Sequence, residues 1–229
     1  MVNAVRTAIT SGILTLIIFT AGIFFGIEMQ KNRVNEIVND YKEMQISWND
    51  IKLQSEIIEK DREITNKEIC ENLVKNNIRF GDEIYEKGKK IATYEKRNDF
   101  ATNLDAQKRE HNLLRLQFWL NSISIKKRCN NTGYVNVVYF YKDNATTVKR
   151  IEQDKISEIL FSIKMDYGKE IMLIPIAIDL NLTSVTTALT EYNLTKFPCV
   201  FINENITIEK IMPKNEIEKI IDEQKRISS

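Results

Sequence analysis

The residues of this sequence that could do redox, metal or nucleophilic chemistry are few and widely spaced. The chain has three cysteines, Cys70, Cys129 and Cys199, and one histidine, His111. A histidine-based triad needs a nucleophile that the imidazole can activate, and zinc sites need clusters of Cys and His. Because no Cys or second His is near His111 in the sequence, we expect it to be a helix-packing or solvated residue. We expect no metal and no cofactor.

Cys70 lies near the start of one helical pattern, over residues 66–97, and Cys129 follows a second, over residues 102–125. The two patterns predict an antiparallel helical hairpin that turns near Asp99. Both cysteines lie at nearly equal distances along the chain from that turn, so the hairpin brings them to the same level at its open end. A disulfide can form there if the Cα atoms come within about 7 Å, and it would indicate an oxidising compartment. The alternative is two unrelated, partly buried thiols.

The N-terminal part of the chain is strongly apolar. Residues 8–27 carry no charged side chain. As a helix they would span roughly 30 Å, the thickness of the hydrocarbon core of a bilayer. A secretory signal would have a shorter apolar region followed by a small-residue cleavage site, and a buried soluble helix is the remaining alternative. We expect an uncleaved single span through 8–27 that contacts the lipid bilayer.

A heptad pattern follows the apolar segment. Apolar residues recur at spacings of three and four, typical of a helix that packs along a coiled-coil seam; they are Val34, Ile37, Tyr41, Met44, Trp48, Ile51 and Ile58. This stripe predicts a helical stalk that could support a homodimer.

The composition excludes several classes of function. The 229 residues include 33 basic and 32 acidic side chains, a net charge of +1, so binding to nucleic acid is not expected. Hydrophobic residues make up 43% of the chain, enough to build a folded core. We divide the chain into an anchor (1–29), a stalk with the helical hairpin (30–129) and a C-terminal domain (130–229).

Strand-like and helix-like patterns alternate in the C-terminal domain. Pro175 lies in the second strand and cannot donate to a ladder, so this strand should lie at a sheet edge or carry a bulge. The order is β-α-β-α-β-β-α, an α/β architecture in which the first two strands are parallel. The expected strands are 135–141, 171–178, 198–202 and 206–211, and the expected helices are 146–167, 183–192 and one that begins at 213 or 214. The helix over 146–167 is amphipathic, and its apolar face consists of Val148, Ile151, Ile156, Ile159, Leu160 and Ile163.

This order resembles the thioredoxin fold. The segment 194–198, which ends in Phe197 and Pro198, resembles the family's cis-proline motif, and Asp179 resembles its usual acidic strand end. The whole chain is similar to archaeal membrane-anchored thioredoxin-like proteins, in which a span, a helical hairpin with flanking cysteines and a thioredoxin-like domain follow one another. Residues 111–120, Cys129 and residues 139–141 carry that resemblance.

The sequence departs from the family where its redox chemistry resides. A redox-active member has Cys-x-x-Cys after the first strand, where a helix N-terminus stabilises the thiolate. Here residues 142–147 read Lys-Asp-Asn-Ala-Thr-Thr, without sulfur. Dithiol exchange by the family's mechanism is therefore not expected. Cys199, next to Pro198, is either a substitute thiol or a small buried hydrophobe.

We therefore expect a single-pass membrane protein whose thioredoxin-like domain binds or scaffolds another protein without catalysis. The alternative is an accessory thiol-disulfide protein that uses Cys199 or the pair Cys70 and Cys129. The expected contact surface consists of Asp143, Asn144, Thr146, Thr147, Phe197, Pro198 and Cys199.

Two kinds of sequence feature bear on the side of the membrane on which the C-terminal domain lies. Lys31 and Arg33 after the span favour a cytoplasmic body by the positive-inside rule. The expected disulfide and five Asn-x-Ser/Thr sequons favour the opposite side, so we expect an extracytoplasmic domain. The sequons are at Asn130, Asn144, Asn181, Asn193 and Asn205.

Overall fold

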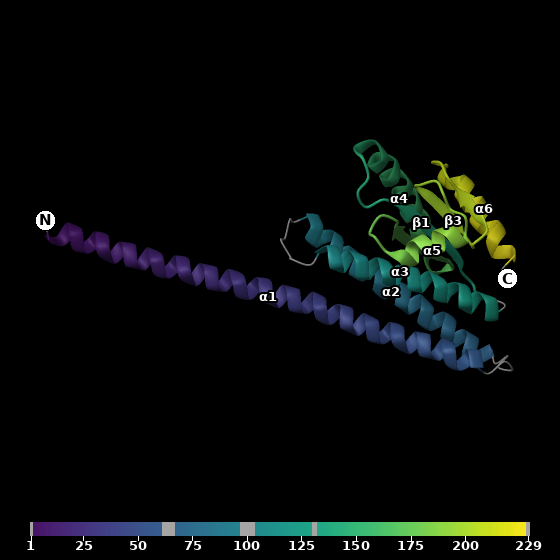
Figure 1. The fold of residues 1–229 in the computed structure, drawn as a ribbon, viewed down its shortest axis with the longest axis horizontal. Helices are drawn as coiled ribbons and strands as arrows, with labels where there is room; N and C mark the ends of the chain where they lie inside the picture. The colour runs from purple at the N-terminus through teal and green to yellow at the C-terminus, as the bar shows by residue number, and fades with distance from the viewer. Residues whose placement is uncertain (1, 61–66, 97–103, 130–131, 228–229) are drawn as a thin grey trace. The chain divides into compact units, whose positions relative to one another are not determined.

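The computed structural model describes residues 2–60, 67–96, 104–129 and 132–227. The chain divides into two compact units, Met1–Ile46 and Ser47–Ser229, each of which is described by itself. Helix α1 (Val2–Lys60) contains the whole of the first unit and the beginning of the second (Figure 1).

The N-terminal unit contains one apolar helical segment. Of the residues that the structure describes, only the helix Arg6–Met29 is long and apolar enough to cross a membrane, with a mean hydropathy of 2.1. By length and composition it could be a membrane span or a signal sequence. Hydroxyl groups within it donate to carbonyls one turn earlier, Thr15 to Ser11 at 2.8 Å and Thr20 to Leu16 at 2.9 Å. Such bonds satisfy polar side chains where no water is available.

The helices of the second unit pack through aromatic side chains. Trp48 of α1, Phe80 of α2 (Lys67–Lys96) and Phe118 of α3 (Leu104–Arg128) are all buried. The ring centroids of Trp48 and Phe80 lie 5.5 Å apart, and those of Phe80 and Phe118 lie 6.1 Å apart. A Cβ at Gly81 would lie 2.8 Å from the Phe118 ring, so the glycine in α2 allows the two helices to approach.

The heptad stripe is described at one position only. Trp48 is buried and packs on Phe80 of its own chain. The side chains of the other stripe residues lie outside the described residues, so the stalk homodimer stays a prediction.

The disulfide predicted from the hairpin is present. Cys70 of α2 and Cys129, directly after α3, are bonded, with their Cα atoms 5.7 Å apart. Cys129 is buried together with Leu73 and Ile125 at the end of the hairpin. The turn expected near Asp99 and the start of the third helix before Leu104 lie outside the described residues.

A mixed four-stranded sheet forms the C-terminal region. Its order is β2-β1-β3-β4, with β1 and β2 parallel and the other neighbouring pairs antiparallel. Pro175 is in β2, which lies at a sheet edge as its sequence predicted. The peptide bond between Phe197 and Pro198 is cis. The strands are β1 (Val135–Tyr141), β2 (Ile171–Ala177), β3 (Cys199–Ile202) and β4 (Ile206–Ile208).

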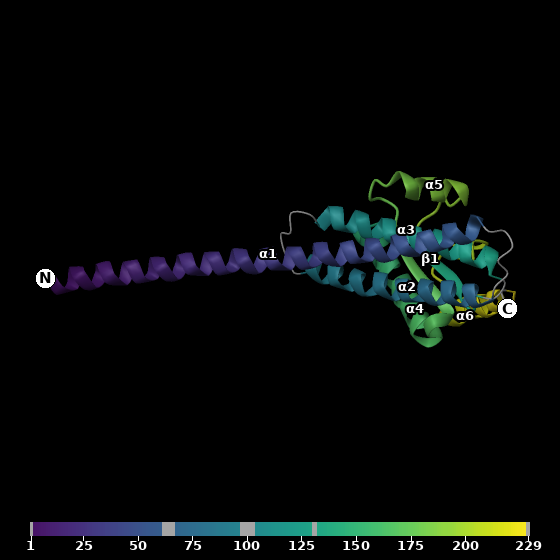
Figure 2. The same ribbon diagram turned by 90° about the horizontal axis from the view of Figure 1, so that it is seen from below.

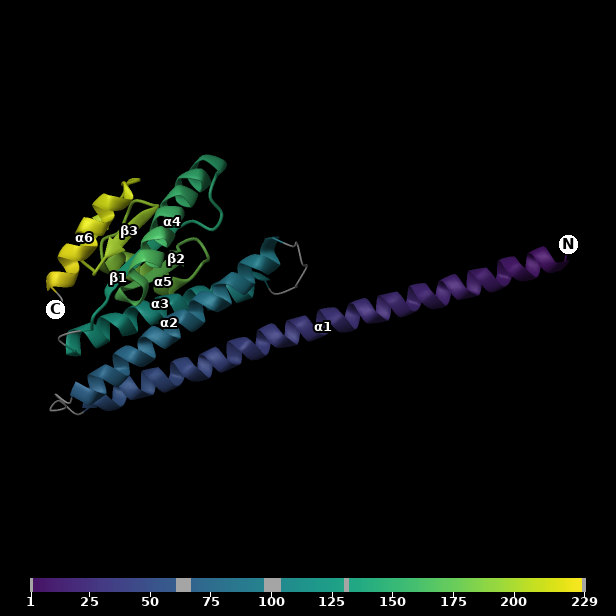
Figure 3. The same cartoon turned by 180° about the vertical axis from the view of Figure 1, so that it is seen from behind.

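Helices cover both faces of the sheet. On one face, α4 (Thr147–Tyr167) and α6 (Lys214–Ile227) bury Val137 and Tyr139 of β1, and Figures 2 and 3 show these two helices together. On the other face, α3 and the short α5 (Thr183–Glu191) cover the alternate residues of β1. The α3 side chain Trp119 lies edge-on to Phe140 at 5.6 Å. A 3-10 turn, η1 (Gly168–Glu170), joins α4 to β2.

The apolar face of α4 is shorter than the sequence pattern predicted. Ile156, Leu160 and Ile163 are buried, but Val148 is 78% exposed and Ile151 54% exposed. The prediction that these two residues belong to the packed face is wrong, because the first turns of α4 extend past the end of the sheet core (Figure 3).

A buried polar network joins the helical hairpin to the sheet. Asn136 of β1 accepts a hydrogen bond from Ser122 of α3 at 2.6 Å and donates to Glu204 at 3.0 Å. Glu204 also accepts from the Trp119 indole at 2.7 Å. Since each of these polar groups finds its partner in another element, the network fixes α3 on the sheet and on the β3–β4 turn.

We expect replacement of both Cys70 and Cys129 by alanine to lower the free energy of unfolding by about 4 kcal/mol, because the bridge joins residues 59 positions apart. Urea unfolding of the full chain in detergent, followed by the fluorescence of the buried Trp48 and Trp119, measures this change. Cys199→Ala is the control, because it removes a buried sulfur without opening a covalent loop. A loss no larger than the control's would mean that the bridge does not constrain the unfolded chain.

Candidate functional site

The candidate site lies where the first two strands end. Because β1 and β2 are parallel, their carboxyl ends meet at one edge of the sheet, and Tyr141 pairs with Ala177 there. Two loops leave this edge, residues 142–146 toward α4 and residues 178–182 toward α5. The helices α4 and α5 cover opposite faces, so the two connections diverge here. In α/β sheets such a divergence opens a crevice in which ligands bind.

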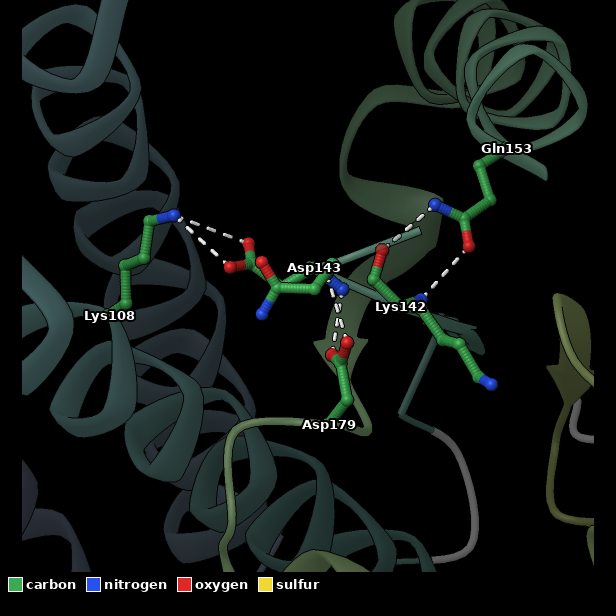
Figure 4. Close-up of polar contacts among 6 residues, drawn as sticks. Lys108, Lys142, Asp143, Gln153 and Asp179 are labelled. Carbon is green, nitrogen blue, oxygen red and sulfur yellow. Dashed lines mark hydrogen bonds and ion pairs between the residues drawn. The ribbon is translucent and has the colours of Figure 1, made fainter. Parts of the chain in front are cut away.

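In this protein a carboxylate of the chain itself binds the loop between β1 and α4. Asp179 accepts hydrogen bonds from the backbone N–H of Asp143 at 2.7 Å and of Asn144 at 2.9 Å (Figure 4). Charged acceptors make the stronger kind of hydrogen bond to backbone N–H groups. An internal carboxylate therefore holds the backbone at the start of this loop.

Two further contacts hold the same loop. The Lys108 ammonium of α3 lies 3.1 Å from the Asp143 carboxylate, and both side chains are largely buried, with exposed fractions of 14% and 22%. On the other side, the Gln153 amide of α4 accepts from Lys142 N at 2.9 Å and donates to Lys142 O at 3.0 Å. Figure 4 shows the loop between these partners. Asp179 and Gln153 therefore hold the loop backbone, and Lys108 holds the Asp143 side chain.

The other part of the predicted surface lies at the same end of the sheet. Phe140 of β1 pairs with Cys199 of β3, so Phe197 and Pro198 precede β3 at the end where the loop leaves β1. Phe197 is half-buried, while Pro198 and Cys199 are buried. From the loop, Asn144, Thr146 and Thr147 are exposed. The predicted surface is thus composed mainly of the loop and Phe197.

The free thiol of Cys199 is poorly suited to exchange chemistry. Its side chain is buried, and burial, with a smaller contribution from Glu209, raises the pKa of Cys199 to about 12. The thiolate is the attacking species in disulfide exchange, and at neutral pH it is therefore scarce. Cys70 and Cys129 are bonded to each other at the open end of the helical hairpin.

Val148 and Ile151 extend this surface, although the sequence pattern placed them in the core. Both are exposed on the first turns of α4, immediately after the loop. No signal in the sequence separates them from the buried residues, because their spacing fits the same helical face.

The single histidine is buried beside the candidate site. His111 of α3 is only 4% exposed, and within the described residues neither of its ring nitrogens has a hydrogen-bond partner. Burial, followed by the nearby Arg115 guanidinium, holds the pKa of His111 well below its ordinary value of 6.5. His111 and Arg115 line a pocket of about 100 Å³ that also includes Tyr141 and Asp143.

Among the residues described, no three His, Cys, Asp or Glu side chains form a cluster that could hold a metal ion. Comparison with protein-family models gives no match, and comparison with curated proteins gives no relative.

We expect Asp179→Asn to lower the free energy of unfolding by about 1–3 kcal/mol. The asparagine amide has one neutral acceptor oxygen for the two loop N–H groups, whereas the carboxylate has two charged ones. Urea unfolding of the full chain measures the loss. Asp154→Asn is the matched control, since Asp154 is an exposed carboxylate on α4. Equal losses in the two variants would contradict the role given to Asp179.

Acid should destabilise the fold through His111. Its pKa in the folded chain lies well below the ordinary 6.5, so below pH 6.5 the unfolded chain gains a proton that folded His111 does not. The free energy of unfolding should then fall by up to about 1.4 kcal/mol for each pH unit. Unfolding in urea at a series of pH values between 7.5 and 5 tests this slope. His111→Phe should unfold with a flatter dependence, and an unchanged slope in that variant would refute the assignment.

Proposed function

We propose that this protein is a membrane-anchored, thioredoxin-like binding protein without redox catalysis, which binds extended polypeptide at the loop 142–147 and Phe197. The observation that carries the proposal is the contact of Asp179 with two backbone N–H groups of a loop that contains no sulfur. A loop tied in this way retains a fixed shape for recognition, while it has no nucleophile for exchange.

The order of the strands supports the thioredoxin-like assignment. A parallel β1–β2 pair joined through α4 is followed by an antiparallel β3–β4 hairpin and a final helix, in the sheet order β2-β1-β3-β4. The Phe197–Pro198 segment and Asp179 take the places that the resemblance implies, before β3 and after β2.

Exposed apolar side chains next to the loop support a binding role. At the start of α4, Val148 exposes most of its surface and Ile151 about half. Apolar side chains clustered at one place on a surface are typical of contact sites for other macromolecules. Exposed Asn144, Thr146 and Thr147 beside them supply hydrogen-bonding groups for a bound backbone.

The N-terminal helix and the disulfide support the proposed location. We take the segment Arg6–Met29 as an uncleaved membrane span. A disulfide between Cys70 and Cys129 persists in an oxidising compartment, which favours an extracytoplasmic C-terminal domain. In the described part of the chain every sequon asparagine is exposed; these are Asn144, Asn181, Asn193 and Asn205.

Site-specific photocrosslinking tests the proposed surface. A photoreactive residue in place of Asn144 should crosslink the full-length protein to a reduced, alkylated, unfolded polypeptide. The same residue in place of Lys169 should not crosslink. Lys169 is in η1, directly before the start of β2, and the loop 142–147 follows the opposite end of the parallel strand β1. The double variant Val148→Asp, Ile151→Asp should weaken binding at least tenfold, since burial of each apolar side chain contributes about 1.5–3 kcal/mol. Equal crosslinking at both positions would contradict the proposal.

An insulin-reduction assay separates the binding role from the accessory thiol-disulfide alternative. We expect the wild-type protein to reduce insulin no faster than the reductant alone. Turnover that Cys199→Ala removes would show that the thiol is active and would overturn the non-catalytic assignment.

A further inference from the structure

The pocket beside His111 has the properties of a ligand site that the proposed function does not use. Gly88 and Ile91 of α2, His111 and Arg115 of α3, and Asp143 and Leu180 of the two loops line it. Its volume of about 100 Å³ compares with roughly 150 Å³ for a cavity known to bind benzene. The pocket therefore accommodates a group of a few non-hydrogen atoms.

The first indication of a ligand is the state of the His111 ring. The side chain is 4% exposed, and both its nitrogens lack a hydrogen-bond partner within the described residues. A buried polar group without partners is unfavourable, and native structures contain few of them. The neutral ring still offers one N–H donor and one acceptor nitrogen.

Gly88 provides the second indication. A Cβ at this position would lie 2.9 Å from His111 Nε2 and 2.9 Å from a terminal nitrogen of Arg115. The ends of the His111 and Arg115 side chains therefore lie side by side against Gly88, where the absence of a Cβ makes room for them. Glycine is unfavourable inside a helix, and its presence at position 88 is explained by the close approach of the His111 and Arg115 side chains.

The charges around the pocket define what would complement it. Lys108 already pairs with Asp143, and the Asn112 amide both donates to and accepts from the Ala177 backbone, at 2.8 Å in each case. Arg115 has no carboxylate partner among the described salt bridges, so its guanidinium and the His111 ring remain for a ligand. A monoanion with two acceptor oxygens matches these donors. A dianion would be repelled more strongly by the Asp143 carboxylate, which also lines the pocket.

We propose that this pocket binds a carboxylate group, which accepts hydrogen bonds from the Arg115 guanidinium and the His111 ring N–H. Arginine and carboxylate form paired, planar hydrogen bonds, and the size of the pocket fits the headgroup of a carboxylic acid. The carboxylate could belong to a small free acid or to a polypeptide chain. The inference goes beyond the proposed function, because the groups that would bind the carboxylate, His111 and Arg115, lie outside the loop 142–147. The loop residue Asp143 lines the pocket but is already paired with Lys108.

The single histidine makes the test selective. In the full-length protein labelled with ¹⁵N-histidine and held in detergent, every imidazole signal comes from His111. Titration with sodium acetate at constant ionic strength, with chloride as the replaced anion, should move these signals along a saturable curve. No movement up to 100 mM acetate, or an equal response to sulfate, would overturn the proposal.

Two variants and one control assign the response to the pocket. Arg115→Gln should weaken acetate binding by at least tenfold, because it removes the cation. Gly88→Ala should weaken acetate binding by displacing the ends of the His111 and Arg115 side chains, and alanine favours the helix, so unfolding would not explain the loss. Arg150→Gln makes the same charge change at an exposed position on α4 and should leave binding unchanged. An unaltered response in both pocket variants would overturn the assignment.

A peptide arm identifies the source of the carboxylate. A short apolar peptide with a free C-terminal carboxylate and the same peptide with an amidated terminus are titrated separately. Saturation by the free-acid peptide at a concentration tenfold below that of acetate would support a polypeptide ligand, and equal concentrations would support a small free acid. A response to the amidated peptide equal to that of the free acid would contradict carboxylate recognition. Failure of the crosslinking test at Asn144 would leave these outcomes unaffected.

Discussion

The hydrogen bonds from the backbone of Asp143 and Asn144 to the Asp179 carboxylate hold the loop at the carboxyl ends of β1 and β2. They exist because parallel strands end at the same edge, which brings a residue just after β2 against the loop that follows β1. The carboxylate satisfies two N–H groups that would otherwise need water or a ligand. The parallel pairing of β1 and β2 and the Asp179 carboxylate together therefore fix the shape of this loop.

The helical hairpin is part of the structure that holds this end in place. Asn112 of α3 bonds to both backbone groups of Ala177, and so caps the outer edge of β2 as a neighbouring strand would. Lys108, one turn earlier on the same helix, bonds to Asp143. The disulfide then fixes the open end of the hairpin, where Cys129 is buried. Helix α3 thus connects the covalent bridge to the loop.

Much of the architecture could be predicted because it follows from local patterns. The β-branched and aromatic run of β1 and the edge position of the strand with Pro175 depend on residues close in sequence. The disulfide could be predicted because Cys70 and Cys129 are almost equally far along the chain from the turn. An antiparallel hairpin places two such residues next to each other. In contrast, the spacing of Val148 and Ile151 fits the packed face of α4, and only the extent of the sheet leaves them exposed.

The pocket around His111 could not be predicted for a related reason. His111 and Arg115 are one helical turn apart, which the sequence shows, but their convergence on Gly88 depends on how α2 packs on α3. The bond between Asn112 and Ala177 joins residues 65 positions apart and leaves no pattern in either segment. The sequence shows that histidine and cysteine are scarce in this chain, but the contacts that these residues make depend on tertiary packing.

Native-state amide hydrogen exchange of Asp143 and Asn144 in the full-length protein tests the central claim most directly. If Asp179 holds the loop, both amides exchange slowly, at rates close to that of Ile178, whose N–H donates to Tyr141 O at 2.9 Å. In Asp179→Asn the two amides should lose this protection while Ile178 retains it. Wild-type exchange at the rate of an unstructured chain would show that the loop is open, and would contradict the account.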